Sequence, residues 1–198
     1  MSAACLTRPF PTKARIGGQE WPIRWQFRHC LSVILAFEDE ELTPAERNYI
    51  LLHTLYPQIP PDEERGLELA LRFLDGGEPE EQREPGEQPP LRLYSFTRDG
   101  GLIYSAFRSQ YGIDLQREEL HWWAFLSLFQ DLSADCLFYR LLHLRQGYLE
   151  GTLSREEEEL LDRMGPSALP PRQPGDRAKE EAAKRFLTEL EGGVGYGG

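Results

Sequence analysis

Histidine is the side chain best suited to proton transfer near neutral pH, and this sequence contains four of them. His29, His53, His121 and His143 are spread over separate predicted helices. Each could act as a general base, but their spacing suggests no serine or cysteine partner for any of them. We therefore expect partly buried or surface histidines. His121 stands out because it precedes Trp122, where it could form a hydrogen bond at an aromatic surface.

The other residues that could carry chemistry form no recognisable site. Cys5, Cys30 and Cys136 are far apart and odd in number, which argues against a disulfide framework and against close metal-ligand pairs. Four consecutive glutamates, 156–159, follow the helix cap Ser154, where negative charge complements the helix dipole. No Glu-x-x-His pair occurs at a suitable position for a two-metal carboxylate site. We expect no catalytic residue, no metal, no cofactor and no enzymatic activity.

Composition sets the class of protein. The chain has 198 residues, 40% hydrophobic and 28% charged, which suits one domain with appendages. Its net charge of -11 disfavours binding to nucleic-acid phosphates and leaves ordinary solubility or nucleic-acid mimicry as explanations. No apolar run approaches the roughly 18 to 20 residues that cross a bilayer, and no signal-peptide core is visible. We expect a cytoplasmic protein that binds neither nucleic acid nor a membrane.

The first third of the chain predicts a β-hairpin followed by helices. Residues 13–23 form the hairpin, because Gly17-Gly18 supplies the positive φ angles of a two-residue turn. Residues 26–38 have helical spacing, and Thr43-Pro44-Ala45-Glu46 is a capping box that begins a helix ending at Pro57. The next helix follows Pro60-Pro61 and should pack antiparallel to its predecessor. Their expected buried stripes are Ala45, Tyr49, Leu52 and Tyr56, and Leu67, Ala70, Leu71 and Leu74.

Four further helices are predicted between residues 91 and 164. Asp99 is expected to cap a helix that Gly112 ends in the left-handed conformation. A largely apolar helix should run over about 117–130. Ser133 is expected to cap the next helix, and Ser154 with Glu157 forms a capping box for the last. The expected buried stripe of the Ser133 helix is Leu137, Leu141, Leu144 and Tyr148.

These elements give a mainly α fold, a compact helical domain with a small N-terminal β-hairpin and a flexible acidic loop. Residues 1–12 are predicted as a flexible N-terminus and 13–164 as the domain. Residues 76–90, with five glutamates against one arginine, are a disordered acidic insertion within it. Residues 165–198 are predicted as a Pro-rich linker, a short amphipathic helix over 177–191 and a disordered Gly-rich tail.

The densest aromatic segment lies between residues 94 and 145, and its bulky side chains offer little chemistry. Such a segment either builds a core or presents a face to another protein. Trp122 and Trp123 point about 100° apart on a helix, so their rings cannot fill one pocket. Core packing of both, or a partner role for one, stays open. The residues that we predict to bind a partner are Tyr104, Phe107, Tyr111, Trp122, Trp123 and Phe125.

An ordered series of motifs resembles the bacteriophage "gene product fifteen" family over roughly residues 8–150. The motifs are Trp21-Pro22-Ile23, Leu55-Tyr56-Pro57-Gln58-Ile59-Pro60-Pro61, Tyr94-Ser95-Phe96, Ile103-Tyr104-Ser105-Ala106-Phe107, Gln110-Tyr111-Gly112-Ile113-Asp114-Leu115, Leu120-His121-Trp122-Trp123-Ala124-Phe125 and residues 132–145. The acidic segment 76–90 and the chain after Gly165 depart from the family pattern.

The resemblance implies a helical tail assembly chaperone of siphophages and prophages. Such a protein would hold the tape-measure protein soluble in the host bacterial cytoplasm and be absent from the mature virion. Other tail proteins, a second copy of the chain or an upstream chaperone product are the further partners that it implies. Its groove for amphipathic helices would lie on the helix of Trp122, Trp123 and Phe125, flanked by that of Tyr104 and Phe107.

Three other readings compete with the chaperone. A structural tail component would stay in purified virions. An acidic DNA mimic or host-interaction protein would align its carboxylates on one face. A small helical enzyme would need a deep pocket that holds a histidine or carboxylate with a shifted pKa.

Overall fold

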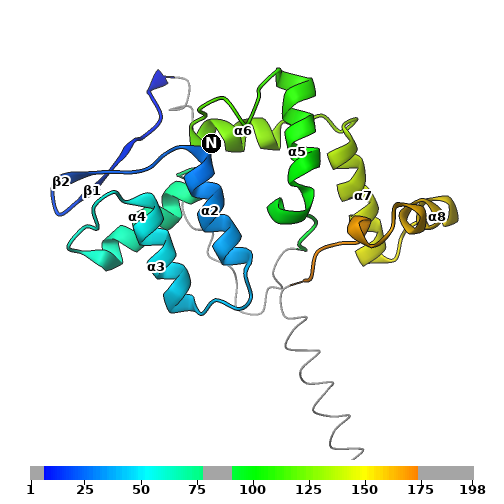
Figure 1. The fold of residues 1–198 in the computed structure, drawn as a ribbon, viewed down its shortest axis with the longest axis horizontal. Coiled ribbons are helices and arrows are strands. Elements are labelled where there is room, and N and C mark those ends of the chain that lie inside the picture. Colours follow the sequence, from blue (N-terminus) through cyan, green and yellow to red (C-terminus); the bar gives the residue numbers. More distant parts are fainter. Residues whose placement is uncertain (1–6, 78–90, 174–198) are drawn as a thin grey trace, which may run out of the picture. The chain divides into compact units, whose positions relative to one another are not determined.

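The computed structural model describes residues 7–77 and 91–173, which are mainly helical with a small N-terminal hairpin, as predicted (Figure 1). In chain order the elements are β1 (Lys13–Ile16), β2 (Gln19–Pro22), α2 (Phe27–Glu38), α3 (Pro44–Leu55), α4 (Glu63–Leu74), α5 (Phe96–Tyr111), α6 (Trp122–Gln130), α7 (Leu137–Glu150), α8 (Arg155–Met164) and the short 3-10 helix η1 (Pro166–Ala168). Most of the predicted acidic insertion, the predicted helix over 177–191 and the Gly-rich tail lie outside the described residues.

The chain divides into two compact units. Unit 1 comprises residues 1–83 and 96–140, and unit 2 comprises residues 84–95 and 141–198. The boundary falls inside α7, after Arg140.

The predicted hairpin of unit 1 is confirmed. Gly17 and Gly18 have φ angles of 56° and 82°, and the flanking pair Ile16–Gln19 closes the turn. At the open end, the Ile23 N–H donates to the Thr12 carbonyl at 2.9 Å. Because the strands pair antiparallel, this bonding pattern fixes which residues of β1 direct their N–H and C=O groups toward β2.

The capping box that begins α3 is also confirmed, but part of its predicted buried stripe is wrong. Thr43 accepts the Glu46 N–H while the Glu46 carboxylate accepts the Thr43 N–H. Tyr49 is 63% exposed and lies against His53, whereas Leu51 and Leu55 are fully buried. The reason is that α2 and α4 both pack on α3 and cover the Leu51 face.

Helix α4 follows Pro60-Pro61 with Asp62 as its cap, and it ends before Gly76 and Gly77, as predicted. Its buried side includes Ala70, Phe73 and Leu74, whereas Leu71, predicted as buried, is 41% exposed.

The starts of α5 and α6 differ from the sequence predictions. Helix α5 begins at Phe96, so Asp99 is a buried residue of its first turn and not its cap. Helix α6 begins at Trp122, about five residues later than predicted. The Glu118 carbonyl, which would accept a helical bond from the Trp122 N–H, accepts from Arg28 instead. The Trp122 N–H donates to the Trp25 carbonyl, so this segment bonds to the start of α2.

The core of unit 1 centres on Phe125. Its ring stacks on Phe27 and Phe107, each at 5.1 Å between ring centroids, on Trp122 at 5.5 Å and on Phe129 at 5.9 Å. Burying one such side chain stabilises a fold by roughly 1.5–3 kcal/mol, and each favourable ring pair adds about 0.5–1.5 kcal/mol. The aromatic segment therefore supplies the centre of this core.

Unit 2 is built around the buried guanidinium of Arg145. It donates to the backbone carbonyls of Leu93, Ser167 and Ala168 over 2.9–3.0 Å. The capping box of Ser154 and Glu157 at the start of α8 is confirmed. The three bonds of Arg145 join Leu93, which precedes α7 in the chain, to Ser167 and Ala168, which follow α8.

The predicted start and stripe of α7 need correction. Ser133 forms a turn, in which its hydroxyl accepts the Asp135 N–H, and the helix begins only at Leu137. Leu137 and Tyr148, predicted as buried, are 56% and 50% exposed. Phe138 is buried in their place.

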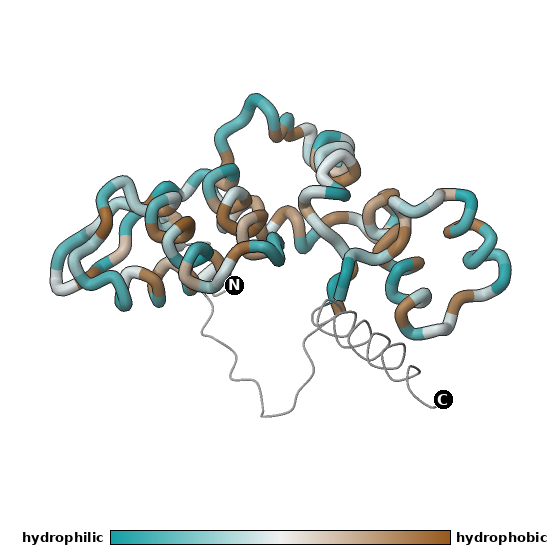
Figure 2. The backbone as a smooth tube through the Cα atoms, turned by 60° about the horizontal axis from the view of Figure 1, so that its bottom comes forward, coloured by the Kyte–Doolittle hydropathy of each residue, from teal (hydrophilic) through white to brown (hydrophobic). Residues whose placement is uncertain are grey.

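Hydrophobic residues recur in short stretches along the helices (Figure 2). Within the described residues, no helix combines the length and the apolar character needed to span a bilayer.

Candidate functional site

The six predicted partner-binding residues all belong to unit 1, but they differ in exposure. Phe107 and Phe125 are fully buried and Trp122 is 2% exposed. These three side chains form part of the core of unit 1. Tyr104, Tyr111 and Trp123 are partly exposed. Partner binding by the six stays a prediction.

His121 joins three segments of unit 1. Its Nδ1 accepts the Trp123 N–H at 3.0 Å and thereby caps α6, so this nitrogen carries no proton. Its Nε2 therefore donates to the Pro11 carbonyl at 3.0 Å. The ring stacks on Phe10 and Trp25. Burial lowers the pKa of His121, the bond to Pro11 opposing this shift. Residues 10 and 11, predicted as flexible, thus contact the start of α6.

The other titratable residues that the sequence singled out have structural surroundings. Burial raises the pKa of the Cys30 thiol to about 12, which makes it a poor nucleophile. Burial, with a contribution from Arg24, lowers the pKa of His29. Hydrogen bonds from Ser154 lower the pKa of Glu157, as expected of a capping carboxylate. Among the described residues, no three potential metal ligands lie together.

A groove of about 330 Å³ lies between α2 and α5 of unit 1. Phe27, Ile103 and Phe125 form its buried floor, and the partly exposed Tyr104 lies at its edge. Leu35, at 39% exposure, stands on the α2 side. The complete lining is Phe27, Arg28, Leu31, Ser32, Leu35, Phe96, Gly100, Ile103, Tyr104, Leu115, Gln116 and Phe125. Its lining is therefore mostly apolar.

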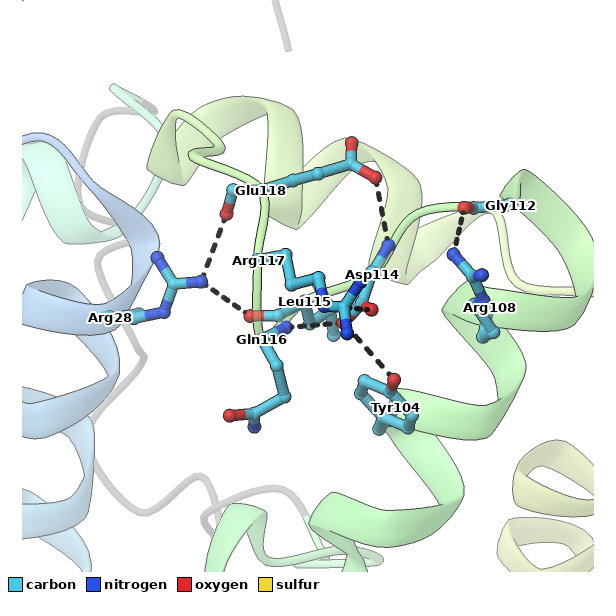
Figure 3. A network of polar contacts seen from close by, with 9 residues as sticks. All are labelled: Arg28, Tyr104, Arg108, Gly112, Asp114, Leu115, Gln116, Arg117 and Glu118. Carbon is cyan, nitrogen blue, oxygen red and sulfur yellow. Dashed lines mark hydrogen bonds and ion pairs between the residues drawn. The ribbon is translucent and has the colours of Figure 1, made fainter.

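The loop between α5 and α6 forms one wall of this groove through Leu115 and Gln116. Arg28 of α2 donates to the carbonyls of Leu115, at 2.7 Å, and Glu118, at 3.1 Å (Figure 3). The Tyr104 hydroxyl donates to Asp114 Oδ1 at 3.2 Å.

That carboxylate anchors the loop from within. The same Oδ1 accepts the Gln116 N–H at 3.0 Å, and this bond, with help from Tyr104, lowers the pKa of Asp114. The polar groups of Arg28, Tyr104 and Asp114 are thus engaged in holding the loop. The wall of the groove is preformed, and its polar groups are used for structure.

Sequence reasoning found the α5 and α6 sides of this groove and missed the α2 side. Leu31 and Leu35 are four residues apart, so they share a face of α2. That spacing was a usable signal. The contribution of Leu115 and Gln116 had no local signal, because Arg28 holds their loop from 87 residues away.

Residues 6–166 match the family model described as Bacteriophage Gp15 protein. The chain belongs to the bacteriophage Gp15 protein family. Membership indicates a phage structural or assembly-related protein. No curated protein and no solved structure matches the chain.

Proposed function

We propose that this Gp15-family protein is a tail assembly chaperone that binds the tape-measure protein during siphophage tail morphogenesis. The groove between α2 and α5 is the observation that carries the proposal. An amphipathic helix binds such a groove through side chains spaced three, four and seven residues apart. Tape-measure helices exposed before assembly would otherwise aggregate through their apolar faces.

The α5 wall of the groove supports close approach of a helix. Gly100 lines the groove, and a Cβ added there would meet no atom within 4 Å. Glycine inside a helix costs about 1 kcal/mol relative to alanine. No packing contact in the described residues explains this cost, whereas a helix packed against the bare backbone would.

The proposal includes a role without enzymatic chemistry. The described residues with shifted pKa values, such as His121, Cys30 and Asp114, are engaged in capping, core packing and loop anchoring. The proposed location is the host bacterial cytoplasm, with the protein leaving before the virion is complete. Other tail proteins, a second copy or an upstream chaperone product are the further partners proposed.

Co-expression with the tape-measure protein of the same phage tests the proposal. Leu35→Gln should lower the soluble tape-measure fraction about tenfold, as expected for a leucine contact worth about 1.4 kcal/mol. Leu71→Gln is the matched control, because Leu71 is equally exposed on α4 and lies outside the groove. Equal solubility with both variants, each folded, would refute the groove as the binding site.

A second pair of variants obstructs the groove. Gly100→Leu should abolish tape-measure solubilisation, whereas Gly101→Leu should leave it unchanged, because Gly101 is exposed on the same helix and does not line the groove. A Cβ at either position meets no atom within 4 Å, so we expect both variants to fold, which circular dichroism checks. Recovery of the unmodified protein in purified virions would instead indicate a structural tail component.

A further inference from the structure

A second groove of unit 1, of about 270 Å³, lies between β1 and α4 and has no lining residue in common with the first. Phe73 and Ile23 are buried beneath it, and Trp123 is partly exposed to it. The complete lining is Pro11, Lys13, Ala14, Arg15, Ile23, Leu69, Arg72, Phe73, Gly77 and Trp123.

The charges around this groove oppose the charge of the chain. The lining contains Lys13, Arg15 and Arg72 and no carboxylate, although the net charge of the protein is -11. Lys13 pairs with Glu20 at 2.8 Å, and all three cations lie on the surface. Glu20, opposite Arg15 in the hairpin register, also interacts electrostatically with Arg15, whereas Arg72 forms no ion pair within the described ranges. The groove is therefore complementary to an acidic ligand.

The main chain of β1 also has an unpaired edge. In an antiparallel hairpin, alternate residues direct their N–H and C=O groups to the partner strand. The register directs those of Ala14 and Ile16 to β2 and those of Lys13 and Arg15 away from it. In the described part of the chain, these outward groups of Lys13 and Arg15 bond to no backbone group. Such an edge is a template for a further strand.

We propose that this groove binds an extended acidic segment of a partner protein, which adds to β1 as a third strand. Side chains alternate across a strand, so every second residue of the ligand would lie on the apolar face of Ala14 and Ile16. The residues between them would lie on the face of Lys13 and Arg15. The ligand is thus a segment that alternates apolar and acidic residues. This proposal does not depend on the groove between α2 and α5, so either proposal can be refuted without the other.

The probe is an acetylated, amidated octapeptide of alternating glutamate and valine, titrated into the isotope-labelled full-length protein. At saturation the Lys13 and Arg15 amides should gain hydrogen-exchange protection, while the Ala14 and Ile16 amides, already bonded to β2, should not. The corresponding lysine–valine peptide should bind at least tenfold more weakly. Equal binding of the two peptides, or unchanged exchange at Lys13 and Arg15, overturns the proposal.

Variants, and exchange measurements without peptide, distinguish a partner segment from other possible occupants of the β1 edge. The double variant Lys13→Gln, Arg15→Gln should weaken binding about tenfold, and the control Arg155→Gln, on an exposed arginine of α8, should not. Protection at Lys13 and Arg15 that grows with protein concentration would assign the edge to a second copy. Protection lost when Glu78, Glu80 and Glu81 become glutamine would assign it to the chain itself. Either result overturns the partner proposal.

Discussion

The indole Nε1 of Trp123 donates a hydrogen bond of 2.8 Å to the backbone carbonyl of Phe73 near the end of α4. The adjacent Trp122 donates to the next carbonyl, that of Leu74, at the same distance. The last carbonyls of a helix have no hydrogen-bond donor within the helix. Here two consecutive tryptophans provide donors to two of these carbonyls. Their rings diverge on α6 yet meet the same helix end, so both serve the fold of unit 1.

Replacing these indoles one at a time should destabilise unit 1 unequally. Trp122→Phe removes the donor and leaves a gap in the core, so we expect a loss of about 2–3 kcal/mol in the free energy of unfolding. Trp123→Phe, at a partly exposed site, should lose about 1 kcal/mol. Urea denaturation measures both, with Trp21→Phe on β2 as the control. Equal losses for the three variants would contradict the capping role.

Acidification should weaken the fold through His121. Burial lowers its folded-state pKa below the usual histidine value of about 6.5, so the folded state favours the neutral ring. This stabilisation is fully present above about pH 6.5 and is lost as the pH falls through the folded pKa. Urea denaturation between pH 5.5 and 7.5 measures the loss.

Two variants show how much of this pH dependence of stability comes from His121 and how much from His29. His121→Asn keeps a side-chain acceptor for the Trp123 N–H and does not titrate, so it should flatten the dependence. The pKa of His29 is also lowered, and His29→Gln should remove its separate share. An unchanged slope in His121→Asn would show that the ring is not the titrating group.

Two glycines inside helices should respond to alanine in opposite directions. At Gly66 a Cβ would lie 2.8 Å from Cγ of the rigid Pro60 ring, so Gly66→Ala should cost about 1–2 kcal/mol. At Gly100 the added methyl meets nothing, so Gly100→Ala should stabilise the fold by about 0.5–1 kcal/mol. Thermal unfolding of both variants measures the difference. Stabilisation by both would mean that the Pro60 turn moves freely.

Unit 2 should depend on the guanidinium of Arg145. A lysine keeps the charge but cannot reach three separate carbonyls, so Arg145→Lys should destabilise the unit by about 3 kcal/mol. Hydrogen exchange should accelerate at the α8 amides more than at those of α3. Arg155→Lys, on an exposed arginine of the same unit, is the control. Equal acceleration with both would argue against the role of Arg145.

Features determined within a few residues were predicted correctly. The Gly17-Gly18 turn and the two capping boxes at Thr43 and Ser154 depend on backbone conformation and short-range hydrogen bonds. Gly112 likewise has the predicted positive φ angle, 72°. Such local signals suffice to place turns and helix starts.

Features determined by distant contacts were not predicted. The start of α6 depends on Arg28 and Trp25, which engage its preceding segment. The exposure of Tyr49 depends on which faces of α3 meet other helices. Distant contacts also explain why the α2 wall of the candidate site was missed, because it depends on how α2 and α5 pack together. The burial of Phe107, Trp122 and Phe125 was also not predicted, because composition alone does not distinguish core aromatic residues from exposed ones.

The bonds at the end of α4 also bear on synthesis. Their acceptors are translated 48 and 50 residues before their donors. Until the indoles leave the ribosome, the nascent chain lacks these two donors, and the rings of Phe27 and Phe73 lack their contacts with Phe125 and Trp123 of α6. Slow translation between Gly77 and Trp122 would prolong that vulnerable stage. A protein proposed to shield another polypeptide from aggregation thus passes through the same hazard while it is being made.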